Sequence, residues 1–235
     1  MSSPSPIDVT LLARLKTLYP TSATDAHDLT WALVAISAFS AANLPEAVPQ
    51  VFTYALEGGA SREKRLQFAR SARDAIFKTG MLSGYPKAIN ALAKLHAATP
   101  EDLRDKEPTR SSQSTTERLH QMGEDLFTST YGEKADDVRK LLYDIYPDLG
   151  HFSITFAYGY VYGSMHALTS AETSFAFVAA LIASDVPTQI DWHLQGARRH
   201  GASVEQIRAV RDIAIEASRA AGVSWKSAIP ELQVA

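Results

Sequence analysis

The sequence contains no cysteine among its 235 residues. Disulfides, thiolate metal sites, cysteine nucleophiles and thiol peroxidase chemistry are therefore all excluded. Its seven histidines also lack the HxH and HExxH spacings that hold a metal ion, so we expect no metal site. We expect no other cofactor.

Long apolar runs and an excess of charge of one sign are missing as well. The longest apolar run, residues 175–183, is far too short to span a bilayer. Residues 1–10 have neither the basic and apolar regions of a signal peptide nor an Arg-rich transit pattern. The net charge of −3 comes from interleaved residues, which leaves no basic face for phosphates. We therefore expect a soluble cytoplasmic protein with no membrane and no nucleic-acid partner.

Helical periodicity is present almost throughout. Residues 8–18 carry the apolar stripe of a half-buried helix, and Ser61 and Ser203 precede Glu63 and Glu205 as helix-start residues do. No segment alternates with a period of two, so the sequence predicts an all-α fold. Further helices are expected at about 26–43, 46–57, 62–79, 86–97, 114–130, 135–145, 150–163, 171–184, 188–199, 204–221 and 225–233.

One polar stretch interrupts this pattern near the middle of the chain. Residues 99–116 contain prolines and a cluster of Ser and Thr, which is typical of a long surface connection. It divides the chain into a half of residues 1–98 and a half of residues 117–235. We expect the two halves to pack as one unit.

The two halves share a repeated segment. Residues 44–81 align without a gap on residues 186–223, at a constant offset of 142. Most matching residues are those that begin and end helices: Pro45 with Pro187, Gly59-Ala60-Ser61 with Gly201-Ala202-Ser203, Glu63 with Glu205, and Gly80 with Gly222. We therefore predict an internal duplication of helical hairpins about an approximate two-fold axis.

The two copies differ at the positions that could carry chemistry. Val51 occupies the position of His193 in the first copy, and Gln50 that of Trp192. Any functional site is therefore expected in the second half, with the first half reduced to packing.

Residues 168–222 resemble the carboxymuconolactone decarboxylase and AhpD-like superfamily, particularly its longer fungal members. Residues 72–95 resemble the closing helices of the same domain. The family pattern is met by Tyr158-Gly159, Glu172-Thr173, Gln189, His193-Leu194, Gly196-Ala197, Gly201-Ala202-Ser203 and Glu205. The resemblance implies stacked helical hairpins, assembled as trimers or hexamers.

The resemblance also separates two kinds of chemistry. The peroxidase branch of the superfamily carries a CxxC motif before its histidine, and its cysteines would fall at Val186 and Gln189. A thiol mechanism therefore cannot operate here. The decarboxylase branch needs no thiol and keeps the histidine, His193 in this chain, in a cofactor-free acid/base site.

Decarboxylation or isomerisation of a small lactone or dienolate needs a group that moves a proton and donors that hold the developing enolate. His193 is the candidate acid/base, because its ordinary pKa of ~6.5 suits either role near neutrality. Glu172 is the candidate that orients it or accepts a proton. Substrate-binding candidates are Tyr158, Tyr162, Gln189, Trp192 and His200.

Simpler structural roles compete with these assignments. In an antiparallel hairpin that turns near Val186, Glu172 lies level with His200, whereas His193 lies ~10 Å lower. The hairpin thus favours contact between Glu172 and His200, while the resemblance favours His193. His193 equally fits a core or interface histidine, Glu172 fits a residue that stabilises the start of its helix, and the tyrosines fit core aromatics.

Three functions remain open from the sequence. The chain is a cofactor-free enzyme acting on a small carbonyl or carboxylate compound, a non-catalytic helical scaffold or binding protein, or a partner of a separate thiol protein. Self-association is expected because residues 150–163 and 171–184 carry more apolar and aromatic surface than one layer of helices covers. The expected partners are thus a small molecule and further copies of the chain.

Overall fold

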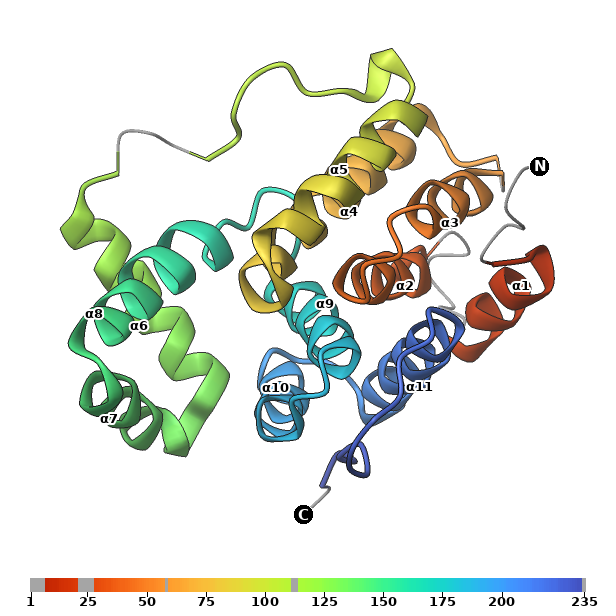
Figure 1. Cartoon of the computed structure of the whole chain (residues 1–235). Coiled ribbons are helices and arrows are strands. Elements are labelled where there is room, and N and C mark those ends of the chain that lie inside the picture. The colour runs from red at the N-terminus through yellow and green to blue at the C-terminus, as the bar shows by residue number, and fades with distance from the viewer. Residues whose placement is uncertain (1–6, 21–27, 58, 111–113, 234–235) are drawn as a thin grey trace.

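The computed structural model describes residues 7–20, 28–57, 59–110 and 114–233. Within these ranges the chain is all-helical and has no β-strand, which confirms the predicted fold class (Figure 1). No helix in the described ranges has both the length and the apolar character needed to cross a membrane.

Connections between successive helices are short except before α2, after α5 and before α9. Their bounds are α1 Val9–Leu18, α2 Thr30–Ala41, α3 Ala47–Leu56, α4 Arg62–Ser83, α5 Tyr85–Ala98, α6 Thr116–Tyr131, α7 Ala135–Ile145, α8 Pro147–His151, α9 Ser170–Ala183, α10 Pro187–Arg199 and α11 Val204–Ala220. Two short 3-10 turns, η1 Glu101–Leu103 and η2 Gly132–Lys134, precede and follow α6, and the π-helix η3, Phe152–Tyr162, continues α8.

Local sequence determines where several helices begin. The hydroxyls of Ser61 and Ser203 accept hydrogen bonds from backbone N–H groups in the first turns of α4 and α11, as predicted. The predicted helix at 225–233 is wrong, because this segment has no regular secondary structure. Arg211 instead donates to the carbonyls of Ile229 and Pro230, which holds the segment against α11.

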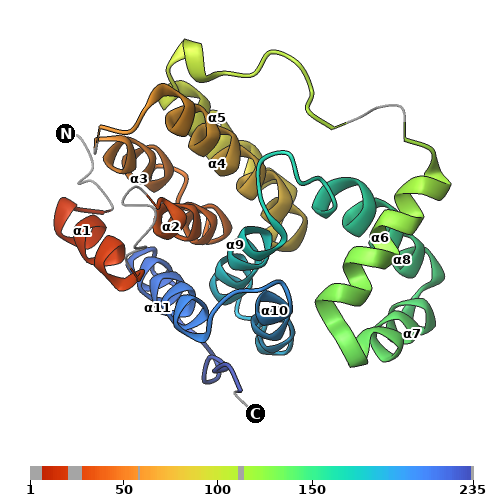
Figure 2. The ribbon, with the colours of Figure 1, turned by 180° about the vertical axis from the view of Figure 1, so that it is seen from behind.

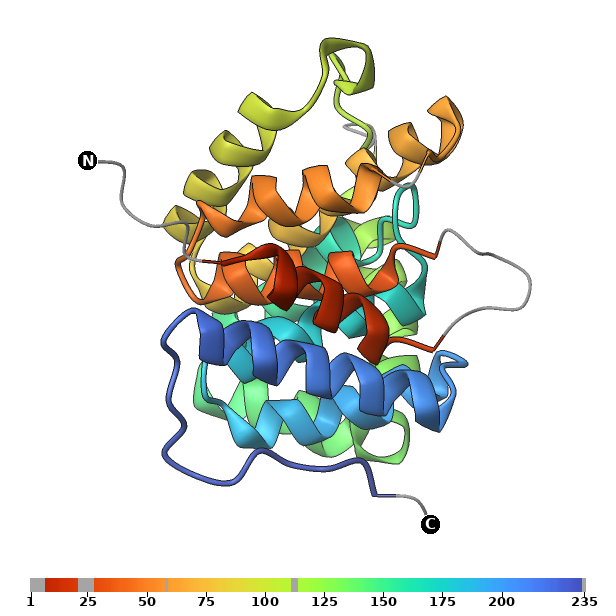
Figure 3. The ribbon, with the colours of Figure 1, turned by 90° about the vertical axis from the view of Figure 1, so that its right-hand side faces the viewer.

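The centre of the molecule is formed by α2 and α9, which pack against each other. In addition, α2 packs on α4 and α11, and α9 packs on the same two helices (Figures 1 and 2). Eleven residues in each of the two central helices are buried. In Figure 3, α11 (blue) lies between α1 (red) and α10 (light blue).

Helices at an offset of 142 occupy corresponding places in this arrangement. The helix α2 corresponds to α9, α3 to α10 and α4 to α11. The turns after α2 and α9 both contain a non-glycine residue in the left-handed region, Asn43 at φ 59° and Asp185 at φ 56°, and these two residues also differ by 142. These observations agree with the predicted duplication, which stays a prediction.

The helices α6, α7 and α8 gather with η3 on one side of the molecule, reached by the long connection of residues 99–115 (Figure 1). Glycines allow α6 and η3 to approach closely. A Cβ atom on Gly123 would lie 1.9 Å from the carbonyl oxygen of Ile154, and one on Gly159 would lie 2.1 Å from that of Leu119. Side chains larger than hydrogen are therefore excluded at both positions.

Candidate functional site

His193 lies in the middle of α10, with 3% of its surface exposed. Its ring contacts two aromatic rings edge-on, with centroid distances of 5.3 Å to Phe177 of α9 and 6.0 Å to Tyr131 of α6. The helix α10 presents this face inward because Ile190, Leu194 and Ala197 are buried with it. His193 is thus enclosed where α6, α9 and α10 meet.

The His193 ring is neutral at ordinary pH. Burial, together with a smaller contribution from the charge of His200, lowers the pKa of His193 to about 4. Its Nδ1 atom is buried and has no hydrogen-bond partner among the described residues. Leaving such an atom unpaired costs about 1–3 kcal/mol, so it requires an explanation.

Phenolic hydroxyls are the other polar groups of this region. Tyr158 of η3 donates a hydrogen bond of 3.0 Å to the hydroxyl oxygen of Tyr131. Burial raises the pKa of Tyr131, Tyr158 and Tyr162, so all three phenols stay protonated near neutral pH. The site therefore combines an uncharged imidazole with phenol groups.

The structure brings several of the predicted substrate-binding residues to this cluster. The ring of Tyr162 packs against Phe177 at 4.6 Å, and that of Trp192 lies 5.7 Å from Tyr131. Gln189 lies one turn before His193, at the partly exposed start of α10. The rings of His193, Tyr131, Tyr158, Tyr162 and Phe177 pack against one another, with centroid distances of 4.6 to 6.1 Å, and we name this group of side chains the aromatic chamber.

Sequence reasoning missed Tyr131. It is the last residue of α6 and stands 62 positions before His193, outside the repeated segment 186–223 that directed attention to His193. The only sequence feature that marks Tyr131 is its place in the apolar stripe of α6. That stripe does not distinguish a tyrosine of the core from a tyrosine of a functional site.

His200 forms a separate polar contact at the end of α10. Its Nδ1 lies 2.9 Å from the Ser174 hydroxyl, and its Nε2 lies 3.3 Å from the Ser129 hydroxyl. Burial lowers the pKa of His200. His200 therefore links α10 to α9 and α6 and takes no part in hydrogen bonding to Glu172.

Glu172 forms no hydrogen bond with either histidine among the described contacts. Its carboxylate accepts hydrogen bonds from the backbone N–H and the hydroxyl of Thr169, and forms the capping box that begins α9. The predicted pairing of Glu172 with a histidine is therefore not seen among the described contacts. Glu172 thus has the simpler of the two roles considered from the sequence, because it stabilises the start of its helix.

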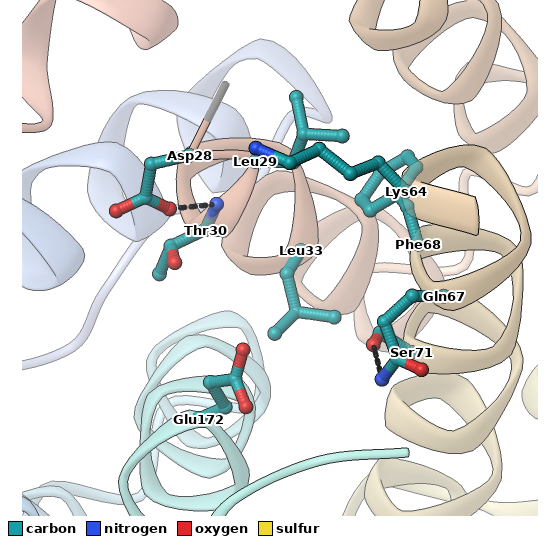
Figure 4. A pocket seen from close by; sticks show the side chains of 9 residues that line it. All are labelled: Asp28, Leu29, Thr30, Leu33, Lys64, Gln67, Phe68, Ser71 and Glu172. Carbon is teal, nitrogen blue, oxygen red and sulfur yellow. Dashed lines mark hydrogen bonds between the residues drawn. The ribbon is translucent and has the colours of Figure 1, made fainter. Parts of the chain in front are cut away.

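Glu172 also faces a small cavity of about 180 Å³ between α2, α4 and α9 (Figure 4). Its polar lining includes Asp28, Gln67 and Ser71, and Phe68 and Leu33 supply apolar walls. The hydroxyl of Ser71 and the amide of Gln67 both donate to the carbonyl of Ala167. These polar groups thus fix the loop before α9.

A buried lysine forms a second polar centre that the sequence did not reveal. Lys78 of α4 has 0% of its side chain exposed, and its Nζ donates to the carbonyl of Ser164 and the hydroxyl of Thr173. Asp74 lies 3.4 Å from the same Nζ and 2.5 Å from a guanidinium nitrogen of Arg110. Burial lowers the pKa of Lys78 to about 8. No local pattern marks such a lysine, because a lysine in an amphipathic helix is ordinarily solvated.

No three His, Asp or Glu side chains within the described part of the chain come together as metal ligands would.

The buried His193 predicts a specific pH dependence of stability. Its pKa is about 4 in the folded chain and ~6.5 when unfolded, so the unfolded state binds more protons between these values. We expect stability to fall as pH drops from 6.5 to 4, and His193→Phe to remove part of this slope. Urea unfolding at a series of pH values measures this slope, and the control is His96→Gln, which changes an exposed histidine. Equal slopes in His193→Phe and His96→Gln would contradict the prediction.

The fold and the chamber together define a class of all-helical protein, in which a buried neutral histidine lies among tyrosines beside a central helix pair. The chain belongs to the family of the yeast peroxisomal proteins named Peroxisomal protein 2. It is 31% identical to the protein of Schizosaccharomyces pombe over 201 residues, covering 85% of this chain and 91% of that protein. It is 29% identical to the protein of Saccharomyces cerevisiae, covering 86% and 92%. No family model matches the chain.

These relatives contradict the predicted cytoplasmic location. Both are named as peroxisomal proteins, which points to the peroxisome instead. Composition could not reveal this, because addresses of this kind are short segments read by receptors. The resemblance to the decarboxylase and AhpD-like superfamily stays a prediction.

Proposed function

We propose that the chain is a cofactor-free enzyme of the peroxisome, which performs acid/base chemistry on a small carbonyl or carboxylate compound in the aromatic chamber. The observation that carries the proposal is the buried Nδ1 of His193, which lacks a partner among the described residues. A substrate oxygen or an acidic C–H group would supply that partner. The names of the two yeast relatives support the compartment.

The proposed chemistry divides between the imidazole and the phenols. Neutral His193 takes a proton from the carbon next to a carbonyl, and returns it to the product. The hydroxyl of Tyr131, which accepts a hydrogen bond from Tyr158, donates to the enolate oxygen that develops, since its raised pKa keeps it protonated. A bound carboxylate raises the pKa of His193 again, which strengthens it as a base when substrate is present.

Substrate reaches the chamber between α6 and α10 in this proposal. Trp192 is only partly buried, and its ring lies edge-on to the buried Tyr131. Displacing Trp192 opens His193 without disturbing the central helices.

The test is an assay of the purified chain on small lactones, β-keto acids and dienolates at pH 7. We expect turnover that falls at least about 100-fold in His193→Ala, because positioned acid/base groups contribute rate factors of that size. The matched control is His96→Gln, which changes an exposed histidine of α5. Unchanged turnover in a folded His193→Ala chain would rule out the proposed role.

A non-catalytic helical protein is the second candidate. The observation that favours it is the close aromatic packing around His193, which leaves only 3% of the residue exposed. On this alternative, none of the compounds above binds to the chain, and the His193 ring signals in NMR spectra do not move when they are added.

We further propose that the chain self-associates through the surface of α7, α8 and η3. The sequence predicted exposed apolar surface on residues 150–163 and 171–184. Other helices of the chain cover α9, so the exposed apolar side chains lie on α7, α8 and η3 instead. The exposed large apolar side chains there are Leu141, Ile145, Tyr146, Leu149, Phe152, Phe156 and Tyr160. An exposed apolar surface of this kind fits a second copy of itself about a two-fold axis.

Sedimentation tests the association. We expect the wild-type chain to sediment as an oligomer and the double variant Phe152→Glu/Phe156→Glu to sediment as a monomer, because a buried unpaired carboxylate opposes assembly. Ile89→Glu is the control, since Ile89 is an equally exposed apolar residue on α5. A monomeric wild type, or an oligomeric double variant, would contradict the proposal.

A further inference from the structure

A cavity of about 430 Å³ lies beside α4, away from the aromatic chamber. Its volume falls in the range of sites that hold small molecules. Three arginines line it, Arg70 and Arg73 from α4 and Arg110 from the connection to α6. Phe77 and Leu92 form apolar walls.

Each carboxylate at this cavity is shared by two cations. Asp105 accepts hydrogen bonds from both Arg70 and Arg73, at 2.7 and 2.8 Å. The guanidinium of Arg70, by its hydrogen bond, lowers the pKa of Asp105, so this carboxylate is ionised at neutral pH. Two guanidinium groups against one carboxylate leave one net positive charge on this wall.

The second wall repeats this imbalance. Asp74 contacts Arg110 at 2.5 Å and the buried Lys78 at 3.4 Å. Arg110 is only 13% exposed, and it also donates to the carbonyls of Tyr160 and Val161. Its guanidinium is thereby held rigidly and lies over the ring of Phe77, 4.7 Å from the centroid. The buried Lys78 does not line the cavity but neutralises part of the charge of Asp74, so the cavity as a whole carries an excess of positive charge.

Donors remain available on the first wall. Arg70 uses Nε and Nη2 for Asp105, and nothing among the described residues accepts a hydrogen bond from its Nη1. The Arg70 side chain is 40% exposed, so a ligand in the cavity can reach this nitrogen. A planar guanidinium of this kind matches a carboxylate or a phosphate.

A neighbouring cavity of about 240 Å³ extends the positive surface. It shares Arg110 and His166 with the first cavity and adds Arg118 from α6. A ligand longer than one acidic group can therefore lie across Arg110.

We propose that this arginine-lined cavity binds a small organic dianion, with one acidic group at Arg70 and Arg73 and the other at Arg110. The apolar part of the ligand contacts Phe77 and Leu92. Dicarboxylates and phosphates share the required chemistry. The site is separate from the chamber of His193, so it does not depend on the proposed enzymatic activity.

Isothermal titration of the full chain with succinate and with inorganic phosphate tests the site. We expect at least one of them to bind with a Kd below about 1 mM at low salt, with acetate binding more weakly. Tighter binding of succinate would identify dicarboxylates, and tighter binding of phosphate would identify phosphorylated compounds. The proposal is overturned if neither succinate nor phosphate binds.

Two arginines of the same helix provide a matched pair of variants. We expect Arg70→Gln to weaken binding about tenfold, the value of one charged hydrogen bond. Arg62→Gln should leave binding unchanged, because Arg62 is exposed, pairs with Asp102 and lies outside the cavity. Equal weakening by both variants would show a general charge effect and overturn the site.

A second test uses the wild-type chain alone, so its result does not depend on whether a variant folds. Arginine-specific modification followed by mass spectrometry should show that the bound dianion protects Arg70 and leaves Arg62 reactive. Equal reactivity of Arg70 with and without the dianion would contradict the proposal.

Discussion

Gly123→Ala and Gly159→Ala are each expected to lower the free energy of unfolding by at least about 3 kcal/mol, because overpacking at a rigid contact is strongly destabilising. The new methyl groups would meet the carbonyl oxygens of Ile154 and Leu119 at 1.9 and 2.1 Å. Main-chain atoms cannot rotate away, so α6 and η3 must separate. Urea unfolding followed by circular dichroism measures the loss.

Gly201→Ala is the control for this pair. A Cβ at Gly201 meets no atom within 4 Å, and the residue has φ 90°. Its substitution should therefore cost only about 1–2 kcal/mol, from the left-handed backbone alone. If Gly123→Ala cost no more than Gly201→Ala, the close approach of α6 and η3 would be refuted.

Asp74→Asn is expected to destabilise the chain by about 3–5 kcal/mol, because it leaves two buried cations without their carboxylate. Lys78→Met should cost less, since Asp74 keeps Arg110 and methionine fills a similar volume. The control is Asp102→Asn, at an exposed pair with Arg62, where the loss should stay within about 1 kcal/mol. Equal losses for Asp74→Asn and Asp102→Asn would contradict the prediction.

The same lysine gives this prediction a pH signature. The pKa of Lys78 is about 8 when folded and ~10.4 when unfolded, so the unfolded chain binds more protons between these values. The contribution of Lys78 to stability therefore increases as pH rises from about 8 to 10. Lys78→Met should lack this increase, and identical profiles for the two chains would show that Lys78 is solvated.

Features set by neighbouring residues were predictable from the sequence. Helix starts such as Ser61 and Ser203 depend on a hydroxyl and the next turn, and the all-α fold follows from the spacing of apolar residues. The clustering of Tyr158, Tyr162 and Trp192 near His193 is also observed, although their role in substrate binding stays a prediction.

Features set by packing between distant segments were not predictable. Tyr131 and Lys78 acquire their surroundings from helices far away in the chain, and no local pattern marks them. Glu172 was predicted at a catalytic centre, but a local capping box accounts for its hydrogen bonds. The final segment, 225–233, has helical spacing and is still irregular, and its carbonyls at Ile229 and Pro230 accept hydrogen bonds from Arg211.

The central pairing of α2 with α9 has a consequence for synthesis of the chain. Eleven of the twelve residues of α2 are buried, yet the helices that cover much of this surface, α9 and α11, begin about 140 and 170 residues further along the chain. At ribosomal rates of about 5–20 residues per second, α2 waits roughly 10–30 s for its partner. During this interval the nascent chain exposes an apolar helix, which makes the first half a substrate for chaperones until the second half emerges.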